Sequence, residues 1–147
     1  MAEVARIPVG IVTACATAKA LDALVVPGRA TGCRVAEDEL LFVCDPDVPG
    51  EVTREVETRL TVVDPDAVVL DTTDGWTAVR IDGDGARIVF ASCSRLRLPE
   101  RGFVQGDVAR VPAKVFADDG GILVLAPSAF EHHLLARLRS VAEVPTS

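Results

Sequence analysis

Acidic residues and glycines recur in the middle of the chain at spacings that could hold a cation. Asp71 and Asp74 stand between two apolar runs, and Asp82-Gly83-Asp84-Gly85 precedes a third. A calcium loop of the EF-hand type places oxygen ligands at alternate positions and ends on a bidentate glutamate. Here Ala86 takes the third ligand position and the chain turns apolar at Ile88, so we interpret these residues as turns and a helix cap. The sequence therefore predicts no metal site.

A cysteine and two histidines could form a nucleophile and its base. Cys93 lies near Arg95 and Arg97, whose positive charges would lower the pKa of the thiol, and His132 or His133 would have to be the base. Because cysteine is a frequent core residue, we interpret Cys93 as structural. Adjacent histidines on a helix point about 100° apart and do not share one metal. The sequence therefore assigns no catalytic residue.

The composition limits the partners that this chain can have. Its 147 residues are enough for one domain over residues 1–147 with a sizeable core. Hydrophobic residues make up 49% of the chain, which indicates that apolar surface lies against a partner, or against a second copy when the chain is alone. With 22 acidic and 15 basic residues the net charge is -7, which disfavours a nucleic-acid partner.

Four cysteines without a C-x-x-C pair indicate a reducing compartment. Cys15, Cys33, Cys44 and Cys93 are expected to be free thiols. The first residues, MAEVARIPVG, carry early charges and lack the long apolar segment of a secretory signal. No apolar run reaches the length of a membrane span. We therefore expect a cytoplasmic protein without a membrane partner.

The first half of the chain alternates helices with a hairpin. Residues 17–25 have the apolar spacing of a helix, and residues 33–44 predict a hairpin that turns at Glu37-Asp38. A second helix is expected over residues 45–60, with Pro49 in its first turn and Asp45 or Asp47 as its cap. Val52, Val56 and Leu60 would lie on one face of this helix.

The second half predicts strands followed by a final helix. Asp74-Gly75 indicates a hairpin turn between residues 68–70 and 77–81. Residues 95–106 are expected to be loop. Ser128 and Glu131 form an S-x-x-E capping box for a helix over residues 129–141. Two further strands are expected at residues 108–115 and 122–125, and a short helix at residues 85–92 capped by Asp82 or Asp84. On the final helix, Phe130, Leu134 and Leu138 are expected to be buried. Together these elements predict an α+β fold, an antiparallel sheet with helices packed on one face.

Several short motifs resemble the gamma subunit of heterotetrameric sarcosine oxidase, a reduced relative of the folate-binding aminomethyltransferase (glycine-cleavage T-protein) domain. The resemblance extends from Gly32 to Leu138. The matching pieces are Asp38 to Leu41, Asp71 to Asp74 with Gly83 to Arg87, Cys93 to Leu98, and Ser128 to Phe130. An acidic residue acts on folate in the aminomethyltransferases, but Leu96 or Arg97 takes that place here, and Leu40 replaces a family tryptophan.

This resemblance implies a fold similar to the aminomethyltransferase domain and a subunit that is not an enzyme by itself. The expected function is a non-catalytic structural or docking subunit of a sarcosine-oxidase-like amine-oxidising complex. The expected partners are larger flavin- and folate-binding subunits. These would hold FAD, FMN, NAD and tetrahydrofolate, while this chain would hold no cofactor.

Two other hypotheses remain open. The chain could be a stand-alone folate, pterin or small-molecule binding protein of the same fold, with its ligand near Asp71 and Trp76. It could also be a small enzyme that uses Cys93 with a histidine.

Overall fold

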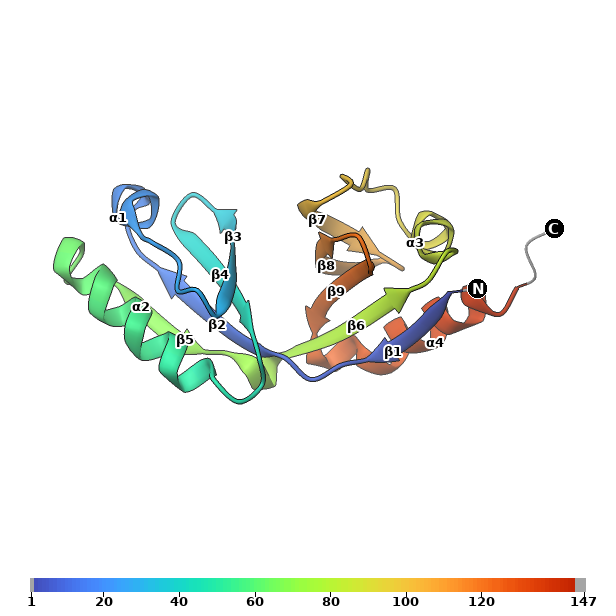
Figure 1. Ribbon diagram of the computed structural model, residues 1–147, viewed down its shortest axis with the longest axis horizontal. Coiled ribbons are helices and arrows are strands. Elements are labelled where there is room, and N and C mark those ends of the chain that lie inside the picture. Colours follow the sequence, from blue (N-terminus) through green and yellow to red (C-terminus); the bar gives the residue numbers. More distant parts are fainter. Residues whose placement is uncertain (1, 145–147) are drawn as a thin grey trace. The chain divides into compact units, whose positions relative to one another are not determined.

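The computed structural model describes residues 2–144 of the chain. They form two compact units, which Figure 1 shows as two groups of strands and helices. Unit 1 comprises residues 2–7 and 74–144, and unit 2 comprises Pro8–Thr73. Unit 2 is thus an insertion in the sequence of unit 1, and each unit has its own sheet. The prediction of one domain over residues 1–147 stays a prediction.

Unit 2 has a four-stranded sheet in the order β3-β4-β2-β5, in which each strand is antiparallel to its neighbours. Its elements are β2 (Gly10–Cys15), α1 (Ala18–Ala23), β3 (Ala30–Ala36), β4 (Glu39–Cys44), α2 (Pro49–Val63) and β5 (Val68–Asp71). This succession of elements and this strand order define the ferredoxin-like arrangement. The predicted first helix and the hairpin at residues 33–44 are confirmed.

The core of unit 2 forms between its helices and alternate residues of its central strands. Val12 of β2 and Phe42 of β4 are completely buried in this cluster. On α2, one stripe of residues four apart faces them, namely Val52, Val56 and Leu60. Pro49 opens α2 as predicted, but the predicted cap at Asp45 or Asp47 is wrong, since the helix begins after Val48 without a side-chain cap.

Unit 1 has a five-stranded sheet in the order β1-β6-β9-β8-β7. Its elements are β1 (Glu3–Arg6), β6 (Trp76–Asp82), α3 (Ala86–Cys93), β7 (Gly102–Val108), β8 (Val111–Ala117), β9 (Gly121–Pro127) and α4 (Glu131–Ala142). The order β1-β6-β9-β8 repeats the order β5-β2-β4-β3 of unit 2. In unit 1, however, the N-terminal strand takes the place of the last strand, and β7 is added at the edge. The units share this topology although the sequence shows no internal repeat.

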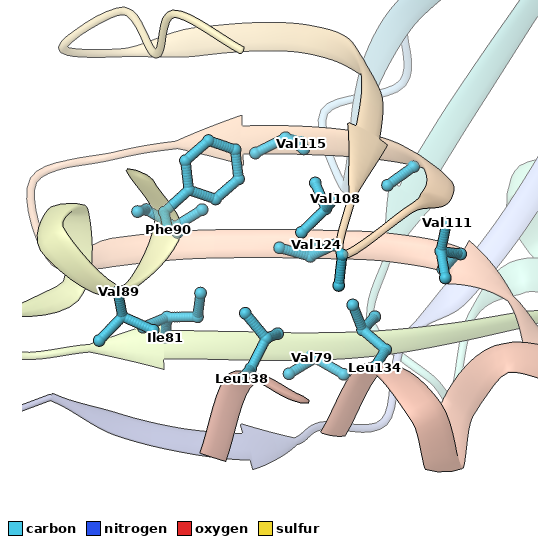
Figure 2. Close-up of a cluster of buried hydrophobic side chains, with 14 of the residues drawn as sticks. Val79, Ile81, Val89, Phe90, Val108, Val111, Val115, Val124, Leu134 and Leu138 are labelled. Carbon is cyan, nitrogen blue, oxygen red and sulfur yellow. The ribbon is translucent and has the colours of Figure 1, made fainter. Parts of the chain in front are cut away.

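The core of unit 1 joins both of its helices to the sheet, as Figure 2 shows. Val79 and Ile81 of β6 lie in one buried cluster with Val89 and Phe90 of α3 and with Leu134 and Leu138 of α4. No helix in the described part of the chain, residues 2–144, combines the length and the apolar character that a membrane crossing requires.

The predicted hairpin around Asp74-Gly75 is wrong. β5 pairs with β2 in the sheet of unit 2, whereas β6 pairs with β1 and β9 in the sheet of unit 1. Asp74 and Gly75 lie instead in a 3-10 turn, η1 (Thr73–Gly75). The α+β class is confirmed, but the described residues form two antiparallel sheets and not one. That helices cover only one face of a sheet stays a prediction.

The final helix begins later than predicted. Ser128–Phe130 form a 3-10 turn, and α4 starts at Glu131 without a side-chain cap. The Glu131 carboxylate accepts a hydrogen bond from the Thr77 hydroxyl at 2.8 Å and pairs with Arg6, so the predicted capping box is wrong. Leu134 and Leu138 are buried as predicted, whereas Phe130 is 42% exposed.

Two strand boundaries also differ from the sequence prediction. β7 occupies Gly102–Val108, within a segment that was expected to be loop up to residue 106. The expected strand at 108–115 is divided by a two-residue turn at Ala109 and Arg110, after which β8 begins. The antiparallel pair β8 and β9 around the turn at residues 118–120 is confirmed.

Truncation of Leu134 will destabilise unit 1 much more than truncation of Phe130. Leu134→Ala removes a fully buried side chain from the core and is expected to cost about 2–5 kcal/mol. Phe130→Ala is expected to cost less than half as much, because Phe130 is already 42% exposed and its removal leaves no enclosed cavity. Urea denaturation followed by circular dichroism measures both variants, and equal losses would contradict the described packing.

Candidate functional site

The two residues predicted to hold a folate or pterin, Asp71 and Trp76, belong to different units. Asp71 ends β5 of unit 2, where its carboxylate accepts hydrogen bonds from the Thr73 amide at 3.0 Å and the Thr73 hydroxyl at 2.6 Å. Trp76 begins β6 of unit 1, is half-buried and lies opposite Pro127. Asp71 thus supports a local turn, and the role of both residues in binding stays a prediction.

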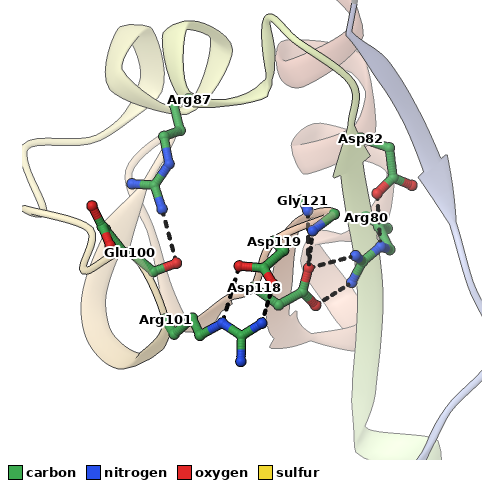
Figure 3. Close-up of polar contacts among 9 residues, drawn as sticks. Arg80, Asp82, Arg87, Glu100, Arg101, Asp118, Asp119 and Gly121 are labelled. Atoms are coloured by element: carbon green, nitrogen blue, oxygen red, sulfur yellow. Dashed lines mark hydrogen bonds and ion pairs between the residues drawn. The ribbon is translucent and has the colours of Figure 1, made fainter.

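The acidic glycine turns of unit 1 are neutralised by arginines, as Figure 3 shows. Arg80 binds Asp82 at 2.8 Å and Asp118 at 2.9 Å, and Arg101 pairs with Asp119. The hydrogen bond from Arg80, assisted by backbone amides, lowers the pKa of Asp118 below its ordinary value. These contacts engage Asp82, Asp118 and Asp119, as expected of residues that form turns.

The N-terminus of α3 does not use the aspartates before it. Gly85 is the first residue before the helix, and it offers no side-chain cap, so the predicted cap at Asp82 or Asp84 is wrong. Among residues 2–144, no group of three or more histidine, cysteine, aspartate or glutamate side chains is placed to hold a metal ion.

A hollow of about 700 Å³ opens in unit 1 where α3 ends. Residues from the end of α3, the following loop and the β7–β8 turn line it, among them Cys93, Ser94, Arg95, Asp107 and Arg110. Its volume lies within the range of about 300–1,000 Å³ that is usual for small-molecule sites. This hollow is a candidate binding site that the sequence did not reveal, because its two arginines are fifteen positions apart in the chain.

The loop beside the hollow is fixed on both sides of Arg95. The Ser94 hydroxyl donates to the Asp107 carbonyl at 2.7 Å and accepts from the Leu96 amide at 3.1 Å. Leu96 lies directly over Gly106, whose φ is +156° and where a β-carbon would come within 2.6 Å of the leucine side chain. A larger residue at position 106 would therefore displace the Leu96 side chain from its place over β7.

The turn on the other side of the hollow is strained. Ala109 and Arg110 have φ values of 51° and 67°, in a region that residues other than glycine rarely adopt. A two-residue hairpin with both central φ values positive normally uses Asn-Gly. Each such residue costs about 1–3 kcal/mol and persists only where the surroundings enforce it.

Two hydrogen bonds enforce this turn. The Ala109 amide donates to the Cys93 carbonyl at 2.7 Å, and Nε2 of His133 lies 2.9 Å from the Ala109 carbonyl. Since a carbonyl only accepts, Nε2 of His133 donates this bond and carries a proton. Both predicted histidines are exposed, and His133 is the one that holds the turn through this bond.

The environment of Cys93 does not activate its thiol, which agrees with its interpretation as a structural residue. Burial raises the pKa of the Cys93 thiol above its ordinary value, and the positive charge of Arg137 opposes this shift only in part. The arginines that the sequence suggested, Arg95 and Arg97, do not cause a shift. A raised pKa keeps the thiol protonated at neutral pH, which disfavours a nucleophile.

Unit 2 exposes an apolar surface formed by the end of α1 and the end of α2. Val25, Val62 and Val63 are 72%, 83% and 50% exposed. Val25 and Val63 line a hollow of about 400 Å³ together with Leu24 and Arg59, and Val62 precedes Val63 at the end of α2. Nearby in the sequence, the edge strand β5 exposes two further apolar side chains, Val68 and Leu70. Exposed apolar side chains beside a hollow are a feature of protein interfaces, so we call Val25, Val62 and Val63 the valine patch.

The net negative charge of the chain comes entirely from unit 2. Unit 2 contains twelve acidic and five basic residues, a net charge of -7, whereas unit 1 contains ten of each. The valine patch therefore lies on a strongly acidic unit, and the hollow with its arginines lies on a neutral one.

Comparison with known proteins identifies the fold. No family model matches the chain, and no curated protein matches it. A chain of heterotetrameric sarcosine oxidase from Corynebacterium sp. U-96 is similar with a TM-score of 0.79 and 12% identity, over 99% of this chain and 88% of that chain. The aminomethyltransferase T of the glycine cleavage system from Bartonella henselae is similar with a TM-score of 0.70 and 16% identity, over 98% of this chain but only 47% of that chain.

A regulatory subunit of aspartate kinase from Thermus thermophilus, in its ligand-free form, is also similar, with a TM-score of 0.56 and 14% identity. The similarity extends over 98% of that subunit and over 96% of this chain. At these identities the likenesses show the fold alone. The chain thus has the fold shared by a chain of sarcosine oxidase and about half of an aminomethyltransferase.

Relief of the strained turn will stabilise the protein. Arg110→Gly is expected to raise the free energy of unfolding by about 1 kcal/mol, because glycine adopts positive φ without steric penalty. The matched control is Arg95→Gly, where φ is not positive and the added freedom of the unfolded chain lowers stability. Thermal unfolding measures both, and a lower melting temperature for Arg110→Gly would contradict the described strain.

The thiol of Cys93 will react slowly with alkylating reagents at pH 8. Its raised pKa leaves a smaller thiolate fraction than in the unfolded chain, so the pH at which iodoacetamide reacts at half its maximal rate is expected to lie above that of the urea-unfolded protein. Mass spectrometry of the peptide that contains Cys93 follows the reaction. A folded protein that reacts faster than the unfolded chain would restore the nucleophile hypothesis.

Proposed function

We propose that this chain is a non-catalytic docking subunit of a sarcosine-oxidase-like, amine-oxidising complex. One observation carries the proposal: the fold is similar to that of a chain in a heterotetrameric sarcosine oxidase, over nearly the whole length of both chains. Mutual coverage of this extent means that the similar chain is a small subunit of comparable length. The aminomethyltransferase likeness, in contrast, covers less than half of a longer chain.

The surface of unit 2 supports this proposal. A subunit that functions by docking needs apolar surface for its partner, and the valine patch offers three exposed side chains, two of which line a shallow hollow. A stable interface buries about 800 Å² on each partner, so the patch would be the centre of a larger contact that includes the polar residues around it. Membership of the gamma-subunit family, which the sequence motifs suggest, is part of the same proposal.

In this function the chemistry belongs to the partner. Larger subunits would hold FAD, FMN, NAD and tetrahydrofolate, and this chain would hold none of them. The complex would be cytoplasmic, which agrees with the finding that the cysteines at positions 15, 33, 44 and 93 form no disulfide within the described residues. The raised pKa of Cys93 also fits a subunit that does not use this thiol in catalysis.

Affinity purification from the native host will recover a larger flavin-containing protein with the tagged chain. Val62→Asp is expected to reduce this recovery about tenfold, because a carboxylate at the centre of an apolar interface loses its hydration without a partner. The matched control is Ile88→Asp, which changes a side chain of unit 1 that is 58% exposed. Circular dichroism verifies the fold of both variants, and the flavin absorbance of the eluate is the measured quantity.

The likenesses to an aminomethyltransferase and to a ligand-free regulatory subunit favour one alternative, a stand-alone folate, pterin or small-molecule binding protein. This alternative predicts a monomer whose Trp76 fluorescence is quenched by a tetrahydrofolate analogue, while a docking subunit without its partner self-associates through apolar surface. Sedimentation with and without the analogue distinguishes them. Tight binding by a monomer that recovers no flavoprotein would overturn the docking proposal.

A further inference from the structure

Two arginines that line the hollow of unit 1 have no partner among residues 2–144. Most other arginines of the described chain are engaged, six of them in ion pairs and two in hydrogen bonds to backbone carbonyls. Arg95 and Arg110 are exposed and line the same hollow of about 700 Å³. Guanidinium groups that line a concave surface are a common means by which proteins bind carboxylates and phosphates.

Contacts within unit 1 fix the backbone of the loop that carries Arg95 and of the turn that carries Arg110. On one side, Ser94 is bonded to Asp107 and Leu96 is packed over Gly106, so the loop residue between them is anchored at both neighbours. On the other side, Arg110 occupies the second position of the strained turn. An arginine in the left-handed region costs stability that glycine would not, so its presence points to a use for the side chain.

The electrostatics of the hollow favour an anion. Its lining carries two positive charges and one carboxylate, that of Asp107. The end of a helix usually disfavours anions because its last carbonyls are free. Here the Cys93 carbonyl accepts the Ala109 amide at 2.7 Å, which removes part of that repulsion.

We propose that this hollow binds a small anion, the carboxylate or phosphate group of a small molecule, between the guanidinium groups of Arg95 and Arg110. The concave shape and ligand-sized volume suit a small molecule rather than a protein segment. The anion site lies in unit 1, whereas the valine patch lies in unit 2. The anion-binding proposal and the docking proposal are therefore separate, and either can fail without the other.

Titration of the purified protein with inorganic phosphate and with citrate tests the site, with sodium chloride added to keep ionic strength constant. Backbone amide chemical shifts report binding at residues 94–96 and 109–111. A saturable shift at these residues is expected with at least one probe. Saturation by phosphate alone identifies a phosphate site, saturation by citrate alone a carboxylate site, and saturation by both a general oxyanion site.

Four variants separate specific binding from general charge effects. Arg95→Gln and Arg110→Gln are each expected to weaken binding about tenfold, because each removes a charge-assisted bond. Asp107→Asn is expected to strengthen it, because the opposing carboxylate is lost. The control, Arg54→Gln, removes the same charge from unit 2 and leaves the affinity unchanged.

Arg110→Gly supplies a second test that does not depend on a loss of folding. It is expected to raise the melting temperature and yet weaken phosphate or citrate binding as much as Arg110→Gln. The absence of a saturable shift with either probe would overturn the proposal. So would shifts that are the same in the wild type and in Arg95→Gln.

Discussion

The pairing of β1 with β6 is the contact on which unit 1 depends. Only four residues of β1 take part, from Glu3 opposite Asp82 to Arg6 opposite Val79, and the Ile7 amide extends the ladder to the Ala78 carbonyl at 3.0 Å. These partners are more than seventy residues apart, with all of unit 2 between them. An unstructured loop of that length would oppose closure by an entropy that rises with its logarithm. Here unit 2 folds on itself, so the effective loop is much shorter.

The two ends of unit 2 are held together inside that unit. The Ile11 amide donates to the Thr73 hydroxyl at 3.0 Å, and the Thr72 amide donates to the Ile11 carbonyl at 2.9 Å. The entry and the exit of the inserted unit are therefore adjacent. This adjacency lets the same strand order exist twice in one chain, once continuous in unit 2 and once in unit 1 with its last strand supplied from the N-terminus.

Local sequence signals predicted elements well and their pairing poorly. The stripe Val52, Val56 and Leu60 and the hairpin at residues 33–44 depend on periodicity within a few turns or strands, and both were found as expected. Asp74-Gly75 is an equally clear local signal, but it could not show that its two flanking strands enter different sheets. Phe130 fell on the predicted apolar face of a helix that in fact begins one residue after it.

The candidate sites were still harder to predict. The sequence pointed to Cys93 but assigned it to the wrong cations, because Arg95 and Arg97 are its neighbours in sequence, whereas Arg137 is the cation that acts on its thiol. The hollow joins a loop after α3 to a turn between β7 and β8, and only the folded sheet brings them together. The strain at Ala109 and Arg110 has no sequence signature, since neither residue is typical of such a turn.

The insertion of unit 2 also has a consequence for synthesis on the ribosome. β1 leaves the exit tunnel first, but β6 and β9 follow only after the whole of unit 2 has been made. Unit 2 has every strand of its sheet within Pro8–Thr73, so it can fold while the rest of unit 1 is still being translated. During that interval the N-terminal segment is an unpaired strand, with Val4 and Ala5 free to meet chaperones or the wrong edge. The order of translation thus leaves β1 without its native partner strand until the whole of unit 2 has been made.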